Sequence, residues 1–162
     1  MKIALASDHA GFSLRMAIAE VLRSHGHTPV DFGPDSDAAV DYPDHGFPAA
    51  EAVAGGQCER GVLVCGSGIG MSIVANKVPG IRAALCTSPK MAEYSRSHND
   101  ANILVLGERI TPRETALEIV NVWLSVPFEG GRHQRRIDRI TAYESGRTAC
   151  PASGESERRV VC

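Results

Sequence analysis

The sequence predicts an α/β fold, a three-layer α/β/α Rossmann-like domain with a five-stranded parallel sheet. Short aliphatic or β-branched runs alternate about five times with segments whose apolar residues recur at helical spacing. One run, Val62-Leu63-Val64, is apolar at consecutive positions, which is typical of a strand buried on both faces. We therefore expect parallel strands that are covered by helices on both sides.

The elements of the first half follow from apolar spacing and from the turn residues between the runs. Leu14, Ile18 and Leu22 fall on one face of a helix, and Gly55-Gly56 ends an alanine-rich helix. The predicted elements are a strand over 2–7, a helix that closes at 25–27, a strand over 28–32, an acidic loop over 33–44, a helix over 47–54, a strand over 62–64 and a helix over 69–75.

Capping residues mark the helices of the second half. Ser88-Pro89 matches an N-cap followed by proline at the first helical position, and Thr111-Pro112-Arg113-Glu114 matches a capping box. The predicted elements are a strand over 81–85, a helix from 88 to about 98–100, a strand over 102–106, a helix that starts at 111 and stops at Pro127, and a last helix after Gly130-Gly131.

The length of 162 residues suits one domain, which we assign to residues 1–145. Residues 146–162 are rich in Gly, Ser, Arg and Glu, and we predict a flexible tail there. No apolar run approaches transmembrane length and no signal-peptide pattern precedes Lys2, so we expect a cytoplasmic protein without membrane contacts. The five cysteines lack C-x-x-C spacing, which argues against a disulfide framework and against a metal site.

The charge pattern favours a small ligand over a polymer. A formal net charge of -2 does not indicate a protein that binds nucleic acid. Residues 132–139 nevertheless contain four arginines, which suit a small anionic ligand. The alternative is an ordinary solvated helix face, and charge alone leaves both interpretations open.

The stretch from Gly61 to Lys77 is the strongest candidate for chemistry. Gly66, Gly68 and Gly70 alternate between a strand and a helix, which places N–H groups at a helix start where anions bind. Cys65 ends the strand beside these glycines. It is interpreted either as a reaction centre or as a cysteine that only packs in the core. A dinucleotide fingerprint fits poorly because Met71 replaces its third glycine, and a phosphate-binding P-loop fits poorly because Lys77 does not follow a glycine.

Other polar residues are expected near Cys65, because ligands bind beyond the carboxyl ends of parallel strands. Asp8, His9 and Arg109 each follow a predicted strand. Asp8 could instead cap a helix, and Arg109 could be surface charge. His98-Asn99 precedes the fifth strand, so it should lie at the opposite end of the sheet unless the preceding helix is short or the chain oligomerises.

Seven separated motifs run in order over residues 1 to about 145. They are Ser7-Asp-His-Ala-Gly-Phe12, Asp41-Tyr-Pro43, Cys65-Gly-Ser-Gly-Ile-Gly-Met-Ser72, Ala75-Asn-Lys77, Ile81-Arg-Ala83, Ser97-His-Asn-Asp-Ala-Asn102 and Gly130-Gly-Arg-His-Gln-Arg-Arg136. Together they resemble the type-B ribose-5-phosphate isomerase family, which includes allose-6-phosphate isomerases and galactose-6-phosphate isomerase subunits.

The resemblance implies an aldose–ketose isomerase that acts on a sugar phosphate through an enediolate and needs no metal and no nucleotide cofactor. It implies that Cys65 is the base, that N–H groups from Gly66 to Gly70 hold the enediolate oxygen, and that Ser67 shuttles protons. It also implies the remaining roles: ring opening by His98 with Asp8, sugar contacts from Tyr42 and Asn99, and phosphate binding by His9, Arg109, Arg132 and Arg136.

The resemblance further implies a homodimer whose active site is shared between chains, with a tetramer left open. A partner could then supply His98-Asn99 or the arginines of residues 132–136. One branch of the family has a glutamate base at the position of Met71 and glycine at the position of Cys65, so this chain resembles the cysteine-base branch. Six-carbon sugar-phosphate isomerisation and a non-catalytic sugar-phosphate-binding regulator remain the alternatives.

Overall fold

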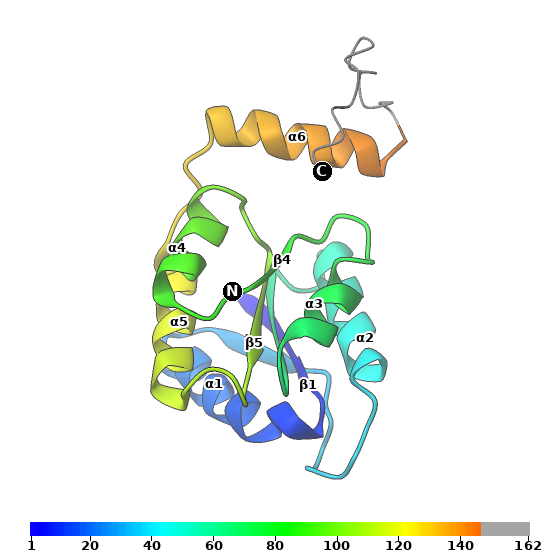
Figure 1. The fold of residues 1–162 in the computed structure, drawn as a ribbon, viewed down its shortest axis with the longest axis vertical. Helices are drawn as coiled ribbons and strands as arrows, with labels where there is room; N and C mark the ends of the chain where they lie inside the picture. Colours follow the sequence, from blue (N-terminus) through cyan, green and yellow to red (C-terminus); the bar gives the residue numbers. More distant parts are fainter. Residues whose placement is uncertain (147–162) are drawn as a thin grey trace, which may run out of the picture.

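The computed structural model describes residues 1–146, and its centre is a five-stranded parallel sheet with the strand order β2-β1-β3-β5-β4 (Figure 1). The strands are β1 (Lys2–Ser7), β2 (Thr28–Asp31), β3 (Arg60–Cys65), β4 (Ala83–Leu85) and β5 (Ile103–Gly107). This confirms the predicted α/β class. Because β1 lies between β2 and β3, the winding direction changes there, and such a switch point is where open sheets bind ligands.

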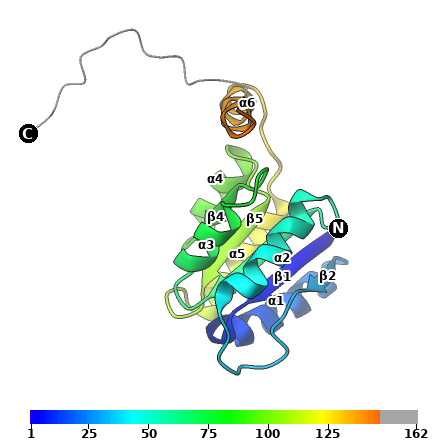
Figure 2. The same cartoon turned by 90° about the vertical axis from the view of Figure 1, so that its right-hand side faces the viewer.

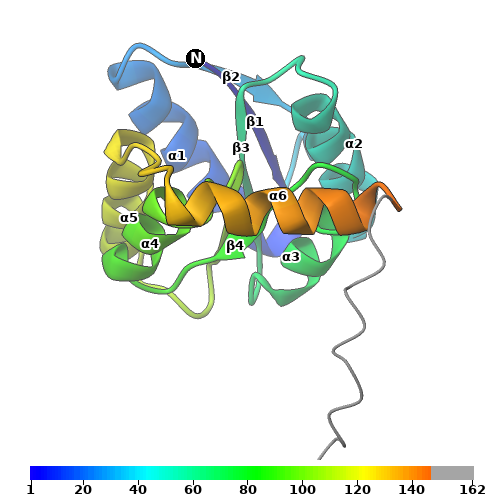
Figure 3. The ribbon, with the colours of Figure 1, turned by 90° about the horizontal axis from the view of Figure 1, so that it is seen from above.

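Helices cover both faces of the sheet (Figure 3). They are α1 (Phe12–Ser24), α2 (Tyr42–Ala54), α3 (Ile69–Ala75), α4 (Pro89–Ser97), α5 (Arg113–Ser125) and α6 (Arg132–Glu144), with a short 3-10 helix η1 (His9–Gly11) after β1. Along β3, Val62 and Val64 join the apolar cluster under α1 and α5, whereas Leu63 and Cys65 join the one under α2 and α3. Strand alternation therefore turns Cys65 toward α2 and α3.

Helix α6 stands apart from the three layers, beyond α4 and at the end of the sheet opposite to the turn between β1 and α1 (Figures 1 and 2). The Glu129 N–H before it donates to the Ser97 carbonyl at 3.0 Å, and at its far end Glu144 Oε2 accepts from the Gly80 N–H at 2.9 Å. Ile140 and Tyr143 are 56% and 71% exposed. Much of α6 is therefore available to meet another molecule.

Some predicted element boundaries differ from those of the structure. Helix α2 begins at Tyr42, inside the predicted acidic loop, because Asp41 takes the N-cap position and Pro43 fits the first turn, while Pro48 is accommodated further on. The predicted capping box does not form, since Pro112 is the N-cap of α5 and the buried Thr111 hydroxyl has no partner within residues 1–146. Strand β4 starts at Ala83, two residues later than expected.

Apart from Gly146, the predicted tail over 146–162 lies outside the described residues. Among the helices that the structure does describe, none combines the length and apolar character needed to span a bilayer. Cys58, Cys65 and Cys86 are free thiols.

Candidate active site

A cavity of about 330 Å³ opens beyond the carboxyl ends of β1 and β3. The residues that line it are Asp8, Tyr42, Cys65, Gly66, Ser67, Gly70, Arg109 and Ile110. The structure thus brings seven predicted site residues together at the switch point of the sheet. Ile110 was not predicted, because nothing in the sequence distinguishes it from any apolar residue beside a loop.

Cys65 is the last residue of β3 and is 4% exposed. Its Sγ accepts a hydrogen bond from the Gly68 N–H at 3.1 Å. Gly68 has a φ of +80°, and a Cβ on it would lie 2.4 Å from Leu85 Cδ1. Only glycine therefore fits the turn that returns this N–H to the sulfur.

The same turn offers further hydrogen-bonding groups at the cavity. The Ile69 N–H donates to Ser67 Oγ at 3.3 Å, which orients that hydroxyl at the edge of the cavity. The N–H groups of Ser67 and Gly70, both on lining residues, donate to no other atom of residues 1–146. These groups can hold negative charge that develops on a bound molecule.

Arg109 reaches the cavity because the loop after β5 pairs with the loop after β3. The Arg109 N–H donates to the Gly66 carbonyl at 2.9 Å, and the Glu108 N–H donates to the Cys65 carbonyl at 3.0 Å. Arg109 Cδ lies 3.5 Å from the position that a Cβ on Gly66 would occupy. The exposed guanidinium is therefore beside the glycine turn, where it can bind an anionic group.

Asp8 caps η1 and also lines the cavity, so its two interpretations are compatible. Its Oδ1 accepts from the Gly11 N–H at 2.9 Å, and the residue is 8% exposed. The neighbouring His9 pairs through Nδ1 with the backbone of Val40 at 3.3 Å, which fixes the loop before α2. This loop leads directly into Tyr42.

Tyr42 closes one side of the cavity by packing against Gly70. A Cβ on Gly70 would lie 2.8 Å from Tyr42 Cζ, so the ring occupies the space that any larger residue would need. By contrast, Met71 is fully buried beside Gly46 and is not among the residues that line the cavity.

Four predicted residues lie elsewhere: His98, Asn99, Arg132 and Arg136. His98 follows α4, and its ring is stacked between those of Tyr94 and His133, with centroid distances of 4.8 and 4.3 Å. Arg132 and Arg136 are exposed on α6. As expected from the position of His98 before β5, this group is at the opposite end of the sheet from Cys65.

His133 was missed, although it lies within one of the recognised motifs. It is 4% exposed, and burial lowers its pKa, assisted by the positive charges of His98 and Arg132 and opposed by Glu129. The side chains of His98, Glu129 and His133 bring one potential metal-ligand atom each within 4.8 Å of one another. The two imidazoles are stacked with planes 4° apart, so their nitrogen lone pairs lie in separate parallel planes and do not converge on one ion.

Comparison with known proteins gives consistent matches over nearly the whole described chain. Residues 3–140 match the family described as Ribose/Galactose Isomerase. Ribose-5-phosphate isomerase B of Escherichia coli is 47% identical over 146 residues, which cover 90% of this chain and 98% of that protein.

Solved structures agree with the sequence matches. Ribose-5-phosphate isomerase B of Clostridium thermocellum is similar with a TM-score of 0.88 and 51% identity, over 91% of this chain and 100% of that one. The Mycoplasma genitalium ribose-5-phosphate isomerase B, solved with bound ribulose-5-phosphate, is similar with a TM-score of 0.85 and 44% identity, over 89% of this chain and 96% of that one.

Proposed function

Because this chain belongs to the ribose/galactose isomerase family, we propose that it interconverts ribose 5-phosphate and ribulose 5-phosphate with Cys65 as the base. The observation that carries the proposal is the Cys65 sulfur, which accepts the Gly68 N–H in a cavity lined by further donors. A relative that binds ribulose-5-phosphate supports the choice of a five-carbon substrate. This interconversion would make the chain an isomerase of the pentose phosphate reactions, and proton transfer by a cysteine base requires neither a metal nor a nucleotide.

The chemistry moves one proton between two carbons. The Cys65 thiolate removes the C2 proton of the open-chain aldose, and the electrons of the C–H bond move to the carbonyl, giving an enediolate with negative charge on O1. Returning the proton to C1 yields the ketose. The N–H groups of Ser67 and Gly70 stabilise the charged oxygen, and the Ser67 hydroxyl moves a proton between O1 and O2.

We propose that the complete site is shared between the chains of a homodimer. Asp8 of one protomer acts with His98 of the partner subunit to open the sugar ring, and Asn99 of the partner subunit contacts the sugar. His9 and Arg109 bind the phosphate together with the partner subunit's Arg132 and the partner subunit's Arg136. The exposure of both arginines on a protruding helix supports this arrangement, because they are free to reach another chain.

Replacing Cys65 with alanine tests the base. We expect turnover of ribose 5-phosphate to fall by at least about 100-fold, because a positioned base contributes that much or more. Binding of ribose 5-phosphate, measured by calorimetry, should largely survive because the phosphate contacts remain. Cys86→Ala is the matched control, since Cys86 is buried on the other face of the sheet and should leave turnover unchanged. Normal turnover by Cys65→Ala would remove this residue from its role.

Mixing two inactive variants tests the shared site. Chains with Cys65→Ala and chains with His98→Ala are each expected to be inactive alone. Random reassortment of dimers produces mixed dimers with one intact site and one doubly altered site. About a quarter of the wild-type activity should therefore return. If none returns after chain exchange has been verified, both residues act within one chain.

The length of the sugar is tested by assaying ribose 5-phosphate beside allose 6-phosphate and galactose 6-phosphate. The family description includes galactose isomerases, so the six-carbon reaction is the specific alternative. Comparable turnover of a six-carbon substrate would overturn the five-carbon assignment. Binding without turnover of any of the three would favour a regulator.

A further inference from the structure

The turn after α4 holds His98 and Asn99, and it ends in backbone that L-residues seldom adopt. Asp100 has a φ of +43°, and no other non-glycine residue within residues 1–146 has a positive φ. Asp and Asn tolerate this region better than other residues, but it persists only where surrounding contacts hold it. Those contacts come from two arginines.

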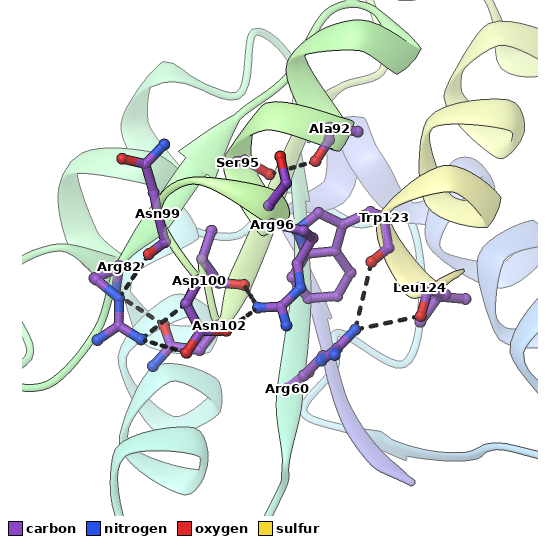
Figure 4. Close-up of polar contacts among 12 residues, drawn as sticks. Arg60, Arg82, Ala92, Ser95, Arg96, Asn99, Asp100, Asn102, Trp123 and Leu124 are labelled. Atoms are coloured by element: carbon purple, nitrogen blue, oxygen red, sulfur yellow. Dashed lines mark hydrogen bonds and ion pairs between the residues drawn. The ribbon is translucent and has the colours of Figure 1, made fainter. Parts of the chain in front are cut away.

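Arg82 and Arg96 hold three consecutive carbonyl groups of the turn (Figure 4). Arg82 donates from Nε to the Asn99 carbonyl at 3.0 Å and from Nη2 to the Asp100 carbonyl at 2.8 Å. Arg96 donates from Nη1 to the Ala101 carbonyl at 2.8 Å and to Asp100 Oδ1 at 2.7 Å. Asp100 Oδ2 also accepts from Arg82 Nη2 at 3.4 Å, so one carboxylate joins both guanidinium groups.

Arg96 is itself fixed in the core. It is 5% exposed, and its guanidinium carbon lies 5.7 Å from the centre of the fully buried Trp123 ring, which Arg60 approaches to 5.3 Å. Burial and the charge of Arg96 lower the pKa of Arg60, whereas Asp100 raises it. The Asp100 carboxylate is thus a counter-ion within a group of three arginines, and this gives the turn one well-defined arrangement.

Arg82 is anchored through its backbone. Its N–H donates to Asn102 Oδ1 at 2.8 Å, and Asn102 Nδ2 donates to the Gly80 carbonyl at 2.8 Å. The start of β4 and the start of β5 are therefore tied to the same turn. None of these residues lines the cavity around Cys65.

We propose that Arg82, Arg96 and Asp100 are positioning residues that hold His98 and Asn99 in the geometry needed to open a sugar ring in the partner's site. This rests on the proposed function, because His98 meets a sugar only if the site is shared. The arginines align the backbone of the turn, and the stacking of Tyr94 and His133 on either side of His98 sets its ring. Together they preorganise a group that lies far from the base.

Arg82→Met in the full-length protein tests the proposal, because Arg82 is the more exposed of the two arginines and its loss leaves the pair of the buried Arg96 with Asp100 in place. Two reactions are compared. Turnover of ribose 5-phosphate requires ring opening. Exchange of the C1 hydrogen of ribulose 5-phosphate with D2O, followed by NMR, requires only enediolate formation, because the ketose with its esterified O5 has no furanose form.

We expect kcat/KM for ribose 5-phosphate to fall by about ten- to a hundred-fold, the usual effect of misplacing a catalytic group. At saturating ribulose 5-phosphate the exchange rate should stay close to that of the wild type. Arg82→Lys keeps the charge without the planar donor pair and should give an intermediate loss. Arg23→Met, at an exposed arginine on α1, is the matched control and should change neither reaction.

An equal fall in both reactions for Arg82→Met would mean that the arginine only stabilises the fold, and it would overturn the proposal. Unchanged turnover would overturn it as well. Cys65→Ala separates this from the proposed function: it should stop both reactions, and persistent exchange in that variant would refute the base whatever Arg82→Met does.

Discussion

Replacing Gly68 with alanine should destabilise the protein strongly, because two separate costs fall on one position. A left-handed φ of +80° costs an L-residue about 1–2 kcal/mol. The new Cβ would lie 2.4 Å from Leu85 Cδ1 and 3.1 Å from the Leu106 carbonyl carbon, and such overpacking costs about 1–3 kcal/mol. The Leu85 methyl can rotate away, but the backbone of β5 cannot. The sum, about 2–5 kcal/mol, is a large part of a typical folding free energy.

Gly80→Ala is the matched control, because Gly80 has nearly the same φ, +82°, and no atom lies within 4 Å of its would-be Cβ. Unfolding in urea should show a loss of only about 1–2 kcal/mol for this variant. The Gly68→Ala protein that remains folded should also turn over substrate more slowly, since the N–H that donates to Cys65 is displaced. Equal losses of unfolding free energy for the two variants would refute the packing argument.

Three further predictions concern the cavity and the buried side chains. Gly70→Ala would bring a Cβ within 2.8 Å of the Tyr42 ring, so the KM for ribose 5-phosphate should rise, and an unchanged KM would contradict the contact. Burial lowers the pKa of His133 below 6.5, so the folded state binds fewer protons than the unfolded chain, and stability should decline as the pH falls below 6.5. Urea unfolding from about pH 7 to about pH 5 should therefore show a flatter pH dependence for His133→Phe, and parallel curves would count against it. Burial raises the pKa of Cys86 to about 11, so iodoacetamide at about pH 8 should leave Cys86 unmodified. The reagent should instead label Cys65 and inactivate the enzyme, and ribose 5-phosphate should prevent both. Labelling of Cys86 with Cys65 unmodified would contradict the role of Cys65 as the base.

The layers of the fold could be predicted because they depend on local patterns. The apolar run in β3 and the helical spacing of Leu14, Ile18 and Leu22 each describe a buried face without reference to the rest of the chain. The start of α2 was missed because two prolines obscure a helix that Asp41 and Pro43 in fact begin. Thr111 has the right spacing from Glu114 for a capping box. The helix nevertheless begins one residue later than such a box requires, so Pro112 and not Thr111 takes the N-cap position.

The site was predictable where it is built from strand ends. Asp8, Cys65 and Arg109 meet because parallel strands bring their carboxyl ends to one edge. The stacking of His133 on His98 was not predictable, since it depends on α6 crossing the far end of the molecule, which no local pattern specifies. The contacts that Arg82 makes with the carbonyl groups of Asn99 and Asp100 were likewise not predictable, since they depend on how the start of β4 lies beside the turn after α4.

The role of Cys65 is tested most directly by a crystal structure of the protein with ribulose 5-phosphate bound, in which the distances from Sγ to C1 and to C2 are measured. We predict that both carbons lie within about 3.5 Å of the sulfur, the approach that proton transfer requires. A sugar whose C1 and C2 lie nearer to another side chain than to Cys65, or outside the cavity altogether, would contradict the mechanism.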